Sequence, residues 1–289
     1  MPGKQSIHHV NGVSLHVAEA GEGSPALVFL HYWGGSSRTW VPVIQSLSQT
    51  NRCVAIDFRG WGLSGEAEDY GLETLAGDVI AVVGDLGLRE FIVVGHSMGG
   101  KVAQLVAARR PAGLKGLILV APTPPTSLHV PEEERQGYVA LYQTREGAET
   151  VIGNLTPHLL SDAHREQIIE DTLRGSPGAK RAWPEQGMVD DISEQASGIT
   201  VPVHVIVGGD DRVEPEASLR AAFGQVLEGV AFIVLPGVGH MAPLEAPAAL
   251  AAAIRSASRS PAAHEPKRPE MNSLSTSRTA TEHHRRAAQ

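Results

Sequence analysis

The chain has 289 residues, a formal net charge of −8 at pH 7 and a single cysteine, Cys53. One cysteine cannot form an internal disulfide, which excludes disulfide-stapled scaffolds. An acidic chain is a poor nucleic-acid binder, so nucleic-acid binding is not expected as the main activity. No apolar run approaches the roughly 18 residues of a membrane span, and the first residues lack a signal peptide's apolar core. We therefore expect a cytoplasmic protein with no membrane span and a well-buried α/β core.

Short apolar runs recur along the chain and predict the strands of a sheet. The pair Asn11-Gly12 separates two short alternating segments, 7–10 and 13–18, which is typical of a β-hairpin. Six continuous apolar runs follow, at 26–30, 53–56, 91–94, 117–120, 203–207 and 231–235. Such runs, bounded by Gly, Pro or Asp, are typical of strands that are buried on both faces of a parallel sheet.

Helical patterns lie between these strands. Residues 74–86 and 98–109 carry apolar side chains at helical spacing, and strands that alternate with helices indicate an α/β fold with crossover connections. From about 122 to 197 no strand is evident, and this segment predicts a helical cap over one edge of the sheet. The helices expected within it lie near 132–143, 148–155 and 162–173.

The C-terminal residues 258–289 differ in composition from the rest of the chain. They contain six basic and three acidic residues, no aromatic residue, and many Ser, Thr, Pro and Ala. Such a segment cannot bury enough apolar surface to offset the entropy lost on ordering. We expect one domain over residues 1–257 followed by a disordered tail, for which weak binding of an anionic partner is the alternative role.

A Gly-x-Ser-x-Gly pattern centred on Ser97 follows one predicted strand and precedes a predicted helix. A serine on a sharp strand-to-helix turn exposes its hydroxyl above the sheet, and small residues at Gly95 and Gly99 let the strand and helix approach each other. The helix also aims its first N–H groups at the same space, where they stabilise a developing oxyanion. This context predicts that Ser97 is a nucleophile rather than an ordinary helix-capping serine.

A serine nucleophile needs a base and an orienting acid, in the chain order Ser, acid, His on this kind of sheet. His240 follows the last predicted strand, at the strand end where ligands bind in open α/β sheets. Two acids, Asp210 and Asp211, follow the preceding strand. On residue type and position alone, either of them could be the triad acid. No carboxylate follows the strand that ends at Val120, so that placement is not available.

The loop after the first long apolar strand is expected to supply a second oxyanion donor. We assign this role to the backbone N–H groups of Trp33 and Met98, with packing in the core as the alternative role of the Trp33 ring. The pattern Gly-x-Gly-x-x-Gly at 60–65 follows a strand but opens no helix, so it does not predict dinucleotide binding. Cys53 is expected in the core, and no Cys/His cluster has the spacing of metal ligands, so no metal or cofactor is expected.

Taken together, the chain resembles the α/β-hydrolase fold superfamily over roughly residues 7–255, in its serine esterase-like branch with a helical cap. The matching segments are the oxyanion loop His31-Tyr32-Trp33-Gly34-Gly35, a structural Asp-x-Arg-Gly-x-Gly-x-Ser turn at 57–64, the nucleophile elbow at 95–100, the strand and Gly-x-x-Asp-x-x-x-Pro segment at 203–215, and the histidine segment at 236–247.

This resemblance implies a mostly parallel central sheet flanked by helices, and it aligns Asp211, not Asp210, with the triad acid. The family commonly has glycine after the loop histidine, where this chain has Tyr32, so the shape of the acyl site is expected to differ here. Related epoxide hydrolases and haloalkane dehalogenases use an aspartate at the position of Ser97, and these activities are set aside. Substrate contacts are expected from His31, Tyr32, Tyr138, Tyr142 and Trp183.

The expected function is that of a serine hydrolase that cleaves a carboxylic ester or related acyl compound through an acyl-enzyme. The same triad would also serve hydrolysis of a C–C bond, a lactone or an amide, cofactor-free perhydrolysis, or hydroxynitrile lyase chemistry. A small-molecule receptor on a hydrolase fold is the alternative outside enzymes. The expected partner is a small-molecule acyl substrate, whereas the natural substrate and the oligomeric state stay open.

Overall fold

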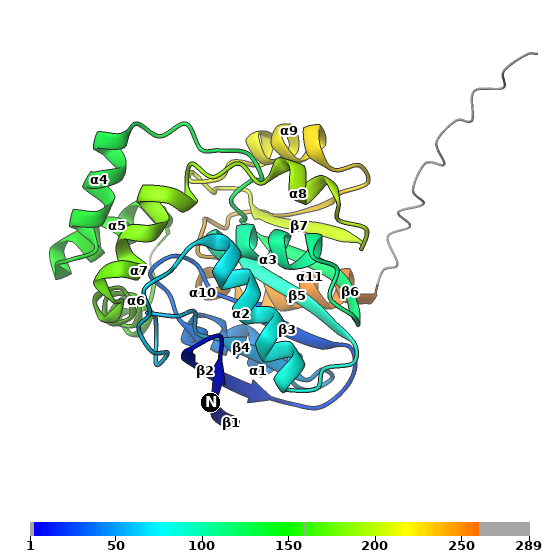
Figure 1. Ribbon diagram of the computed structural model, residues 1–289. Coiled ribbons are helices and arrows are strands. Elements are labelled where there is room, and N and C mark those ends of the chain that lie inside the picture. The colour runs from blue at the N-terminus through cyan, green and yellow to red at the C-terminus, as the bar shows by residue number, and fades with distance from the viewer. Residues whose placement is uncertain (1–2, 159, 260–289) are drawn as a thin grey trace, which may run out of the picture.

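The computed structural model describes residues 3–158 and 160–259, and its described strands form one eight-stranded sheet (Figure 1). The strand order is β1-β2-β4-β3-β5-β6-β7-β8. The hairpin strands β1 and β2 are antiparallel to their neighbours, and the strands from β3 to β8 pair in parallel. The strands are β1 (Lys4–Val10), β2 (Val13–Ala20), β3 (Ala26–Leu30), β4 (Cys53–Ile56), β5 (Phe91–His96), β6 (Leu114–Val120), β7 (Val203–Gly208) and β8 (Ala231–Leu235).

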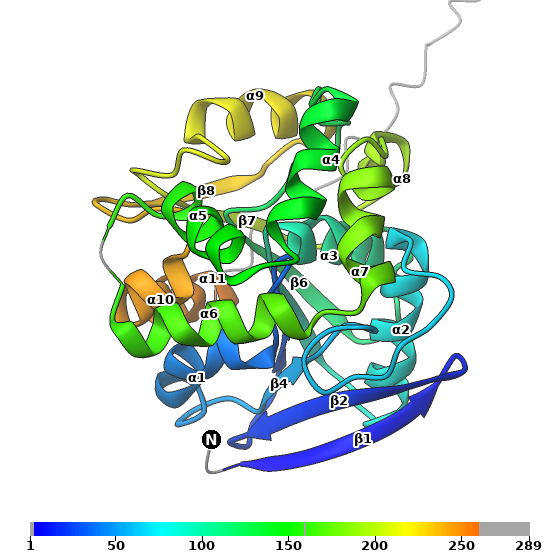
Figure 2. The same cartoon turned by 90° about the vertical axis from the view of Figure 1, so that its left-hand side faces the viewer.

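Helices cover both faces of the sheet, with α2 and α3 on one face and α1 and α11 on the other (Figures 1 and 2). The helices of the sheet layers are α1 (Val41–Leu47), α2 (Leu72–Asp85), α3 (Met98–Ala108), α9 (Glu216–Val226) and α11 (Pro247–Arg259), with the short helices η1 (Ser37–Trp40) and α10 (Ala242–Glu245) beside them. Helix α11 includes two residues that the sequence assigned to the tail. The rest of that predicted tail, 260–289, lies outside the described residues.

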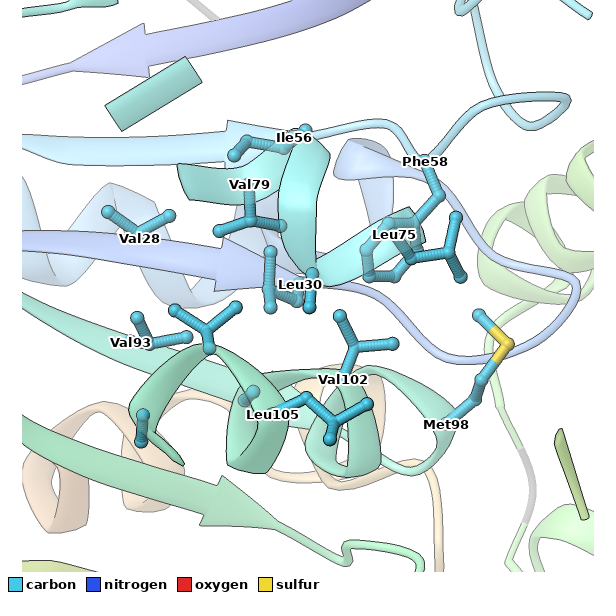
Figure 3. Packing of buried hydrophobic residues seen from close by; sticks show 14 of the residues in the cluster. Val28, Leu30, Ile56, Phe58, Leu75, Val79, Val93, Met98, Val102 and Leu105 are labelled. Carbon is cyan, nitrogen blue, oxygen red and sulfur yellow. The ribbon is translucent and has the colours of Figure 1, made fainter. Parts of the chain in front are cut away.

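The parallel strands divide their side chains between two apolar layers. In β3, Val28 and Leu30 pack under α2 and α3, whereas Leu27 and Phe29 pack under α1 and α11. Figure 3 shows part of the first layer, which reaches Met98 at the start of α3. Because successive side chains of a strand point to opposite faces, a strand covered on both faces must be apolar throughout. This is why continuous apolar runs predicted these strands.

Strand β8 is an exception to that prediction. Four of its five residues are only partly buried, although its sequence Ala-Phe-Ile-Val-Leu reads as a fully buried strand. The reason is its position, since β8 is the last strand in the sheet order and has a neighbour on one side only. At the opposite edge, Asn11 (φ +48°) and Gly12 (φ +76°) form the predicted hairpin turn.

Between β6 and β7 the chain forms a helical segment, 122–197, that lies at one end of the sheet (Figures 1 and 2). Two hydrogen bonds join the chain where it enters and leaves this segment, from Leu128 N–H to the Met188 carbonyl (2.8 Å) and from Ile192 N–H to the Pro125 carbonyl (2.8 Å). Its helices are α4 (Glu132–Leu141), α5 (Arg145–Leu155), α6 (Asp162–Arg174), α7 (Pro177–Ala182), the π-helical turn η2 (Trp183–Gly187) and α8 (Ser193–Ser197). Among the described residues, no helix has the length and apolar character needed to cross a membrane.

Candidate active site

Ser97 stands on the sharp turn between β5 and α3. Its backbone has φ +54° and ψ −119°, a region that non-glycine residues rarely adopt. The Ser97 N–H donates to the Val120 carbonyl on the neighbouring strand (3.1 Å), which holds the turn in place. The side chain is not used to cap α3, and it faces the cavity described below. The strained turn therefore presents the hydroxyl at the carboxyl end of the sheet.

The turn requires glycine on both sides of Ser97. A Cβ atom on Gly95 would lie 2.4 Å from the Gly99 carbonyl oxygen, and one on Gly99 would lie 2.5 Å from the His31 carbonyl oxygen. Neither backbone oxygen can move without displacing its own element. The two glycines thus allow α3 to pack directly against β5 and against the end of β3.

Gly99→Ala is expected to lower the free energy of unfolding by about 1–3 kcal/mol, because the added methyl group forces α3 away from the loop after β3. Chemical denaturation measures this loss. Gly224→Ala in α9 is the matched control, since nothing lies within 4 Å of its added Cβ and alanine favours a helix. Equal stability of the Gly99 variant and wild type would contradict the close approach.

His240 and Asp211 meet at the same end of the sheet. His240 Nδ1 lies 2.9 Å from Asp211 Oδ2, and both side chains are buried. Asp211 Oδ1 also accepts backbone N–H bonds from Val213 (2.9 Å) and Glu214 (3.0 Å), which orient the carboxylate. Because the Asp211 carboxylate can only accept this hydrogen bond, the neutral His240 ring carries its proton on Nδ1. Its Nε2 is therefore left free to accept a proton.

Asp210, the other candidate acid, lies apart from this pair. Its carboxylate is half-exposed and Oδ2 lies 3.1 Å from His158 Nε2 on the loop after α5. The geometry thus assigns Asp211, and not Asp210, to the histidine.

The loop that carries His240 is supported by two residues whose roles sequence reasoning did not find. Glu245 accepts backbone N–H bonds from Gly239 (2.8 Å) and Met241 (2.9 Å), on either side of the histidine. His96, the residue before the nucleophile, donates from Nε2 to the His240 carbonyl (2.9 Å). Burial, and then the nearby charge of His240, lowers the pKa of His96 well below its ordinary value, so the ring stays neutral.

The backbone N–H groups of Trp33 and Met98, which the sequence analysis assigned to the oxyanion, have no acceptor within the described part of the chain. Met98 begins α3, so its N–H has no intrahelical partner. Trp33 lies in the loop after β3, and its ring stacks on Tyr142 with centroids 3.5 Å apart. The Tyr142 hydroxyl also donates to the Trp33 carbonyl (3.1 Å), which fixes the peptide between Trp33 and Gly34 against the end of α4.

A buried hydrogen-bond network holds the loop after β3 from below. His31 donates from Nδ1 to the Tyr32 carbonyl (2.7 Å) and accepts the Phe58 N–H at Nε2 (3.1 Å). Asp57 accepts from the Ser37 N–H (2.5 Å) and from His16 Nδ1 (2.8 Å). Burial alone would raise the pKa of Asp57, but the His16 hydrogen bond, the nearby charge of His31 and two backbone N–H groups hold it below its ordinary value.

Asp57→Asn is expected to lower the free energy of unfolding at pH 7 by about 3 kcal/mol, because an amide cannot accept from all three donors that face the carboxylate. The native pKa of Asp57 is depressed, so its contribution is present above the pKa of an unfolded carboxyl group and is lost as the pH falls below about 4. Denaturation at a series of pH values should therefore show the two proteins converging in acid.

Asp85→Asn is the control for this comparison, since the Asp85 side chain is 57% exposed. It should change stability little at any pH, as surface ion pairs contribute about 0–1 kcal/mol. A difference between Asp57→Asn and wild type that stays constant down to pH 3 would contradict the role given to the carboxylate.

Ser97 and His240 open into one cavity of about 480 Å³, a size within the usual range of small-molecule sites. Most of its wall is apolar and comes from the helical segment and from the loop after β3. Of the five expected substrate contacts, four line this cavity: Tyr32, Trp183, Tyr138 and Tyr142. His31 does not line it, because the ring is fully buried and its nitrogens are bonded to the Tyr32 carbonyl and to the Phe58 N–H on the loop after β4, so we correct its expected role to a structural one.

One wall of the cavity is formed by the loop after β7 and contributes Arg212, Val213 and Glu214. Sequence reasoning did not select these residues. The Gly-x-x-Asp-x-x-x-Pro spacing marks Asp211 but carries no sign of which following side chain turns toward the cavity.

Comparison with known proteins agrees with this architecture. The model of the alpha/beta hydrolase family matches residues 27–253. The AB hydrolase superfamily protein YfhM of Bacillus subtilis (strain 168) is 30% identical over 236 residues, which are 71% of this chain and 80% of that protein. The pimeloyl-[acyl-carrier protein] methyl ester esterase of Nitrosomonas europaea is 28% identical over 239 residues, 78% of this chain and 92% of that protein.

Among solved structures, the enol-lactonase from Burkholderia xenovorans LB400 superimposes with a TM-score of 0.76 and 23% sequence identity, over 88% of this chain and all of the lactonase chain. At that identity the likeness concerns the fold. The family match, by contrast, spans both the elbow at Ser97 and the loop of His240. The chain belongs to the alpha/beta hydrolase family.

Proposed function

We propose that the protein is a serine hydrolase that cleaves a carboxylic ester of a small molecule. The observation that carries this proposal is the cavity in which a strained Ser97 and a His240–Asp211 pair face the same space. The two unpaired N–H groups of Trp33 and Met98 beside the serine supply what a developing oxyanion needs. A second hydrogen-bonded Ser–His–Asp chain, Ser6–His8–Asp85, starts on the edge strand β1, and none of its residues lines this cavity.

Each group has a defined part in the proposed reaction. Ser97 Oγ attacks the ester carbonyl carbon while His240 Nε2 takes the hydroxyl proton. Asp211 keeps Nδ1 protonated and stabilises the imidazolium, and the N–H groups of Trp33 and Met98 bind the oxyanion. His240 then protonates the leaving alkoxide, which leaves an acyl-Ser97, and a water activated by the same histidine releases the acid.

Two features favour an ester among the reactions that this triad can serve. The similar esterase from Nitrosomonas europaea acts, by its name, on a methyl ester of an acyl chain. The cavity wall is mostly apolar and aromatic, which suits an acyl chain. The helical segment 122–197 is proposed to act as the cap of the hydrolase domain, since its residues complete the cavity. A receptor without catalysis would not need the hydrogen bonds that orient Asp211 and His240.

Hydrolysis of p-nitrophenyl esters of increasing acyl length tests the proposal. We expect release of p-nitrophenol with saturation kinetics by the wild-type protein, and loss of that activity in Ser97→Ala. If wild type and Ser97→Ala were equally inactive across the series, the protein would not be an esterase of this type.

A further inference from the structure

Glu214 is a buried acid in the cavity that the proposed reaction does not use. It follows the triad acid by three positions, is 7% exposed and lines the same cavity as Ser97 and His240. Its backbone N–H is bonded to Asp211, but its side-chain carboxyl makes no hydrogen bond and no ion pair with any residue in 3–158 or 160–259. A carboxyl group in this position therefore faces the cavity without a protein partner.

The neighbouring groups are already occupied. Lys101, on α3, is the cation whose charge acts on Glu214, yet its Nζ donates to the carbonyl oxygens of Thr126 (3.2 Å) and Asp190 (2.6 Å). Both oxygens of Asp211 accept other hydrogen bonds. Leaving a buried polar group unpaired costs about 1–3 kcal/mol, so a buried group without a protein partner usually bonds to water or to a ligand.

The protonation state of Glu214 defines what it can bind. Burial, and then the negative charge of Asp211, raises the pKa of Glu214 to about 8, although Lys101 opposes this shift. The other titratable or charged groups that line the cavity are Arg212 on the same loop, His240 on the loop after β8, and His129 and the tyrosines of the helical segment and the loop after β3. Near pH 7 the carboxyl group is uncharged and can donate its O–H, as carboxylic acids do in other apolar sites.

We propose that Glu214 is a specificity-determining residue that donates a hydrogen bond to a second carbonyl oxygen of the substrate, so that the preferred esters carry an oxo, amide or second ester group. This inference rests on the proposed function, because the first test below measures the rate of ester hydrolysis. A carbonyl oxygen suits the site because it only accepts hydrogen bonds and brings no charge into an apolar cavity. A charged partner would add a buried ion beside the Asp211–His240 pair.

The test compares p-nitrophenyl esters of oxo-alkanoic acids, with the oxo group at successive positions, against the esters of the parent alkanoic acids. For the best oxo position, wild type is expected to favour the oxo ester by about tenfold in kcat/KM, the value of one hydrogen bond to a buried donor. Glu214→Leu should remove this preference and Glu214→Gln, whose amide also donates, should keep it. Glu216→Gln, on the outer surface of α9, is the matched control and should keep it too.

The pH dependence separates recognition from a merely structural role. As the pH rises above about 8, Glu214 loses its proton, so the preference of wild type for the oxo ester should fall while that of Glu214→Gln stays constant. A preference that is absent at every oxo position, or that is unchanged in Glu214→Leu, would overturn the proposal. The proposal would also be overturned if the preference of both wild type and Glu214→Gln for the oxo ester stayed constant above pH 8.

Binding to the Ser97→Ala variant distinguishes this proposal from the proposed function. Calorimetric titration of that variant with the oxo ester and its parent should show about tenfold tighter binding of the oxo ester, lost when Glu214→Leu is added. Glu214-dependent binding without any Ser97-dependent cleavage would refute ester hydrolysis and keep the recognition site. Cleavage with equal affinity for the two esters would refute the recognition site and keep ester hydrolysis.

Discussion

Ser97→Ala is expected to lower kcat for ester hydrolysis by about four to six orders of magnitude, because nucleophilic attack and every later step depend on the serine oxygen. Substrate affinity should change little, since the cavity walls are untouched. The side chain of Ser97 does not cap α3, so the variant should unfold at nearly the wild-type temperature. Steady-state kinetics with a p-nitrophenyl ester and thermal denaturation measure the two properties on the same preparations.

Ser6→Ala on the edge strand β1 is the matched control for this change, and it should hydrolyse the ester at the wild-type rate. A Ser97→Ala variant that retained more than a tenth of the wild-type rate would show that another group carries the reaction.

Asp211→Asn is expected to lower kcat by about 10⁴-fold, whereas Asp210→Asn should change it by less than about fivefold. An amide at position 211 can offer an N–H to His240, which favours the tautomer whose Nε2 carries a proton and cannot act as a base. The Asp210 carboxylate is half-exposed, and its one side-chain hydrogen bond among the described residues is to His158 on the loop after α5. The two variants change the same chemical group at adjacent positions, so each is the control for the other.

Parallel rate measurements on both variants, with circular dichroism to check folding, give the result directly. A larger loss at Asp210 than at Asp211 would contradict the hydrogen bond between Asp211 and His240 as the orienting contact.

The central strands could be predicted from the sequence because burial on both faces leaves a plain signal. Strand β3 has the same ends in the sequence prediction and in the structure, from Ala26 to Leu30. Strand β8 has an equally apolar sequence but lies at the sheet edge, and a strand's place in the sheet order depends on pairing with distant segments that its own residues do not encode.

The chemical groups at strand ends were predictable for a related reason. Parallel strands bring their carboxyl ends to one edge, so Ser97, His240 and an acid at Asp210 or Asp211 could be chosen from positions in the chain, and the resemblance to the hydrolase family selected Asp211. What a buried side chain bonds to could not be chosen in this way. His31 was expected to contact substrate and instead anchors the loop, because its partners, the Tyr32 carbonyl and the Phe58 N–H, are known only once the loop and the following turn are placed together.

Glu214 illustrates the same limit on the cavity side. Its sequence position next to a proline predicts only a loop, and its burial depends on how the helical segment covers the loop after β7. The pKa shift follows from that burial and from the distance to Asp211, neither of which the sequence states.

Covalent labelling with a fluorophosphonate tests the central claim most directly, because the reagent phosphonylates only a serine that is activated as a nucleophile. Intact-mass spectrometry of wild type should show one added phosphonyl group with loss of fluoride, and peptide mapping should place it on Ser97. The Ser97→Ala variant should stay unlabelled, and His240→Ala should react much more slowly. Labelling of the wild type at another residue, or no labelling under conditions that modify a known serine esterase, would contradict the assignment of Ser97 as the nucleophile.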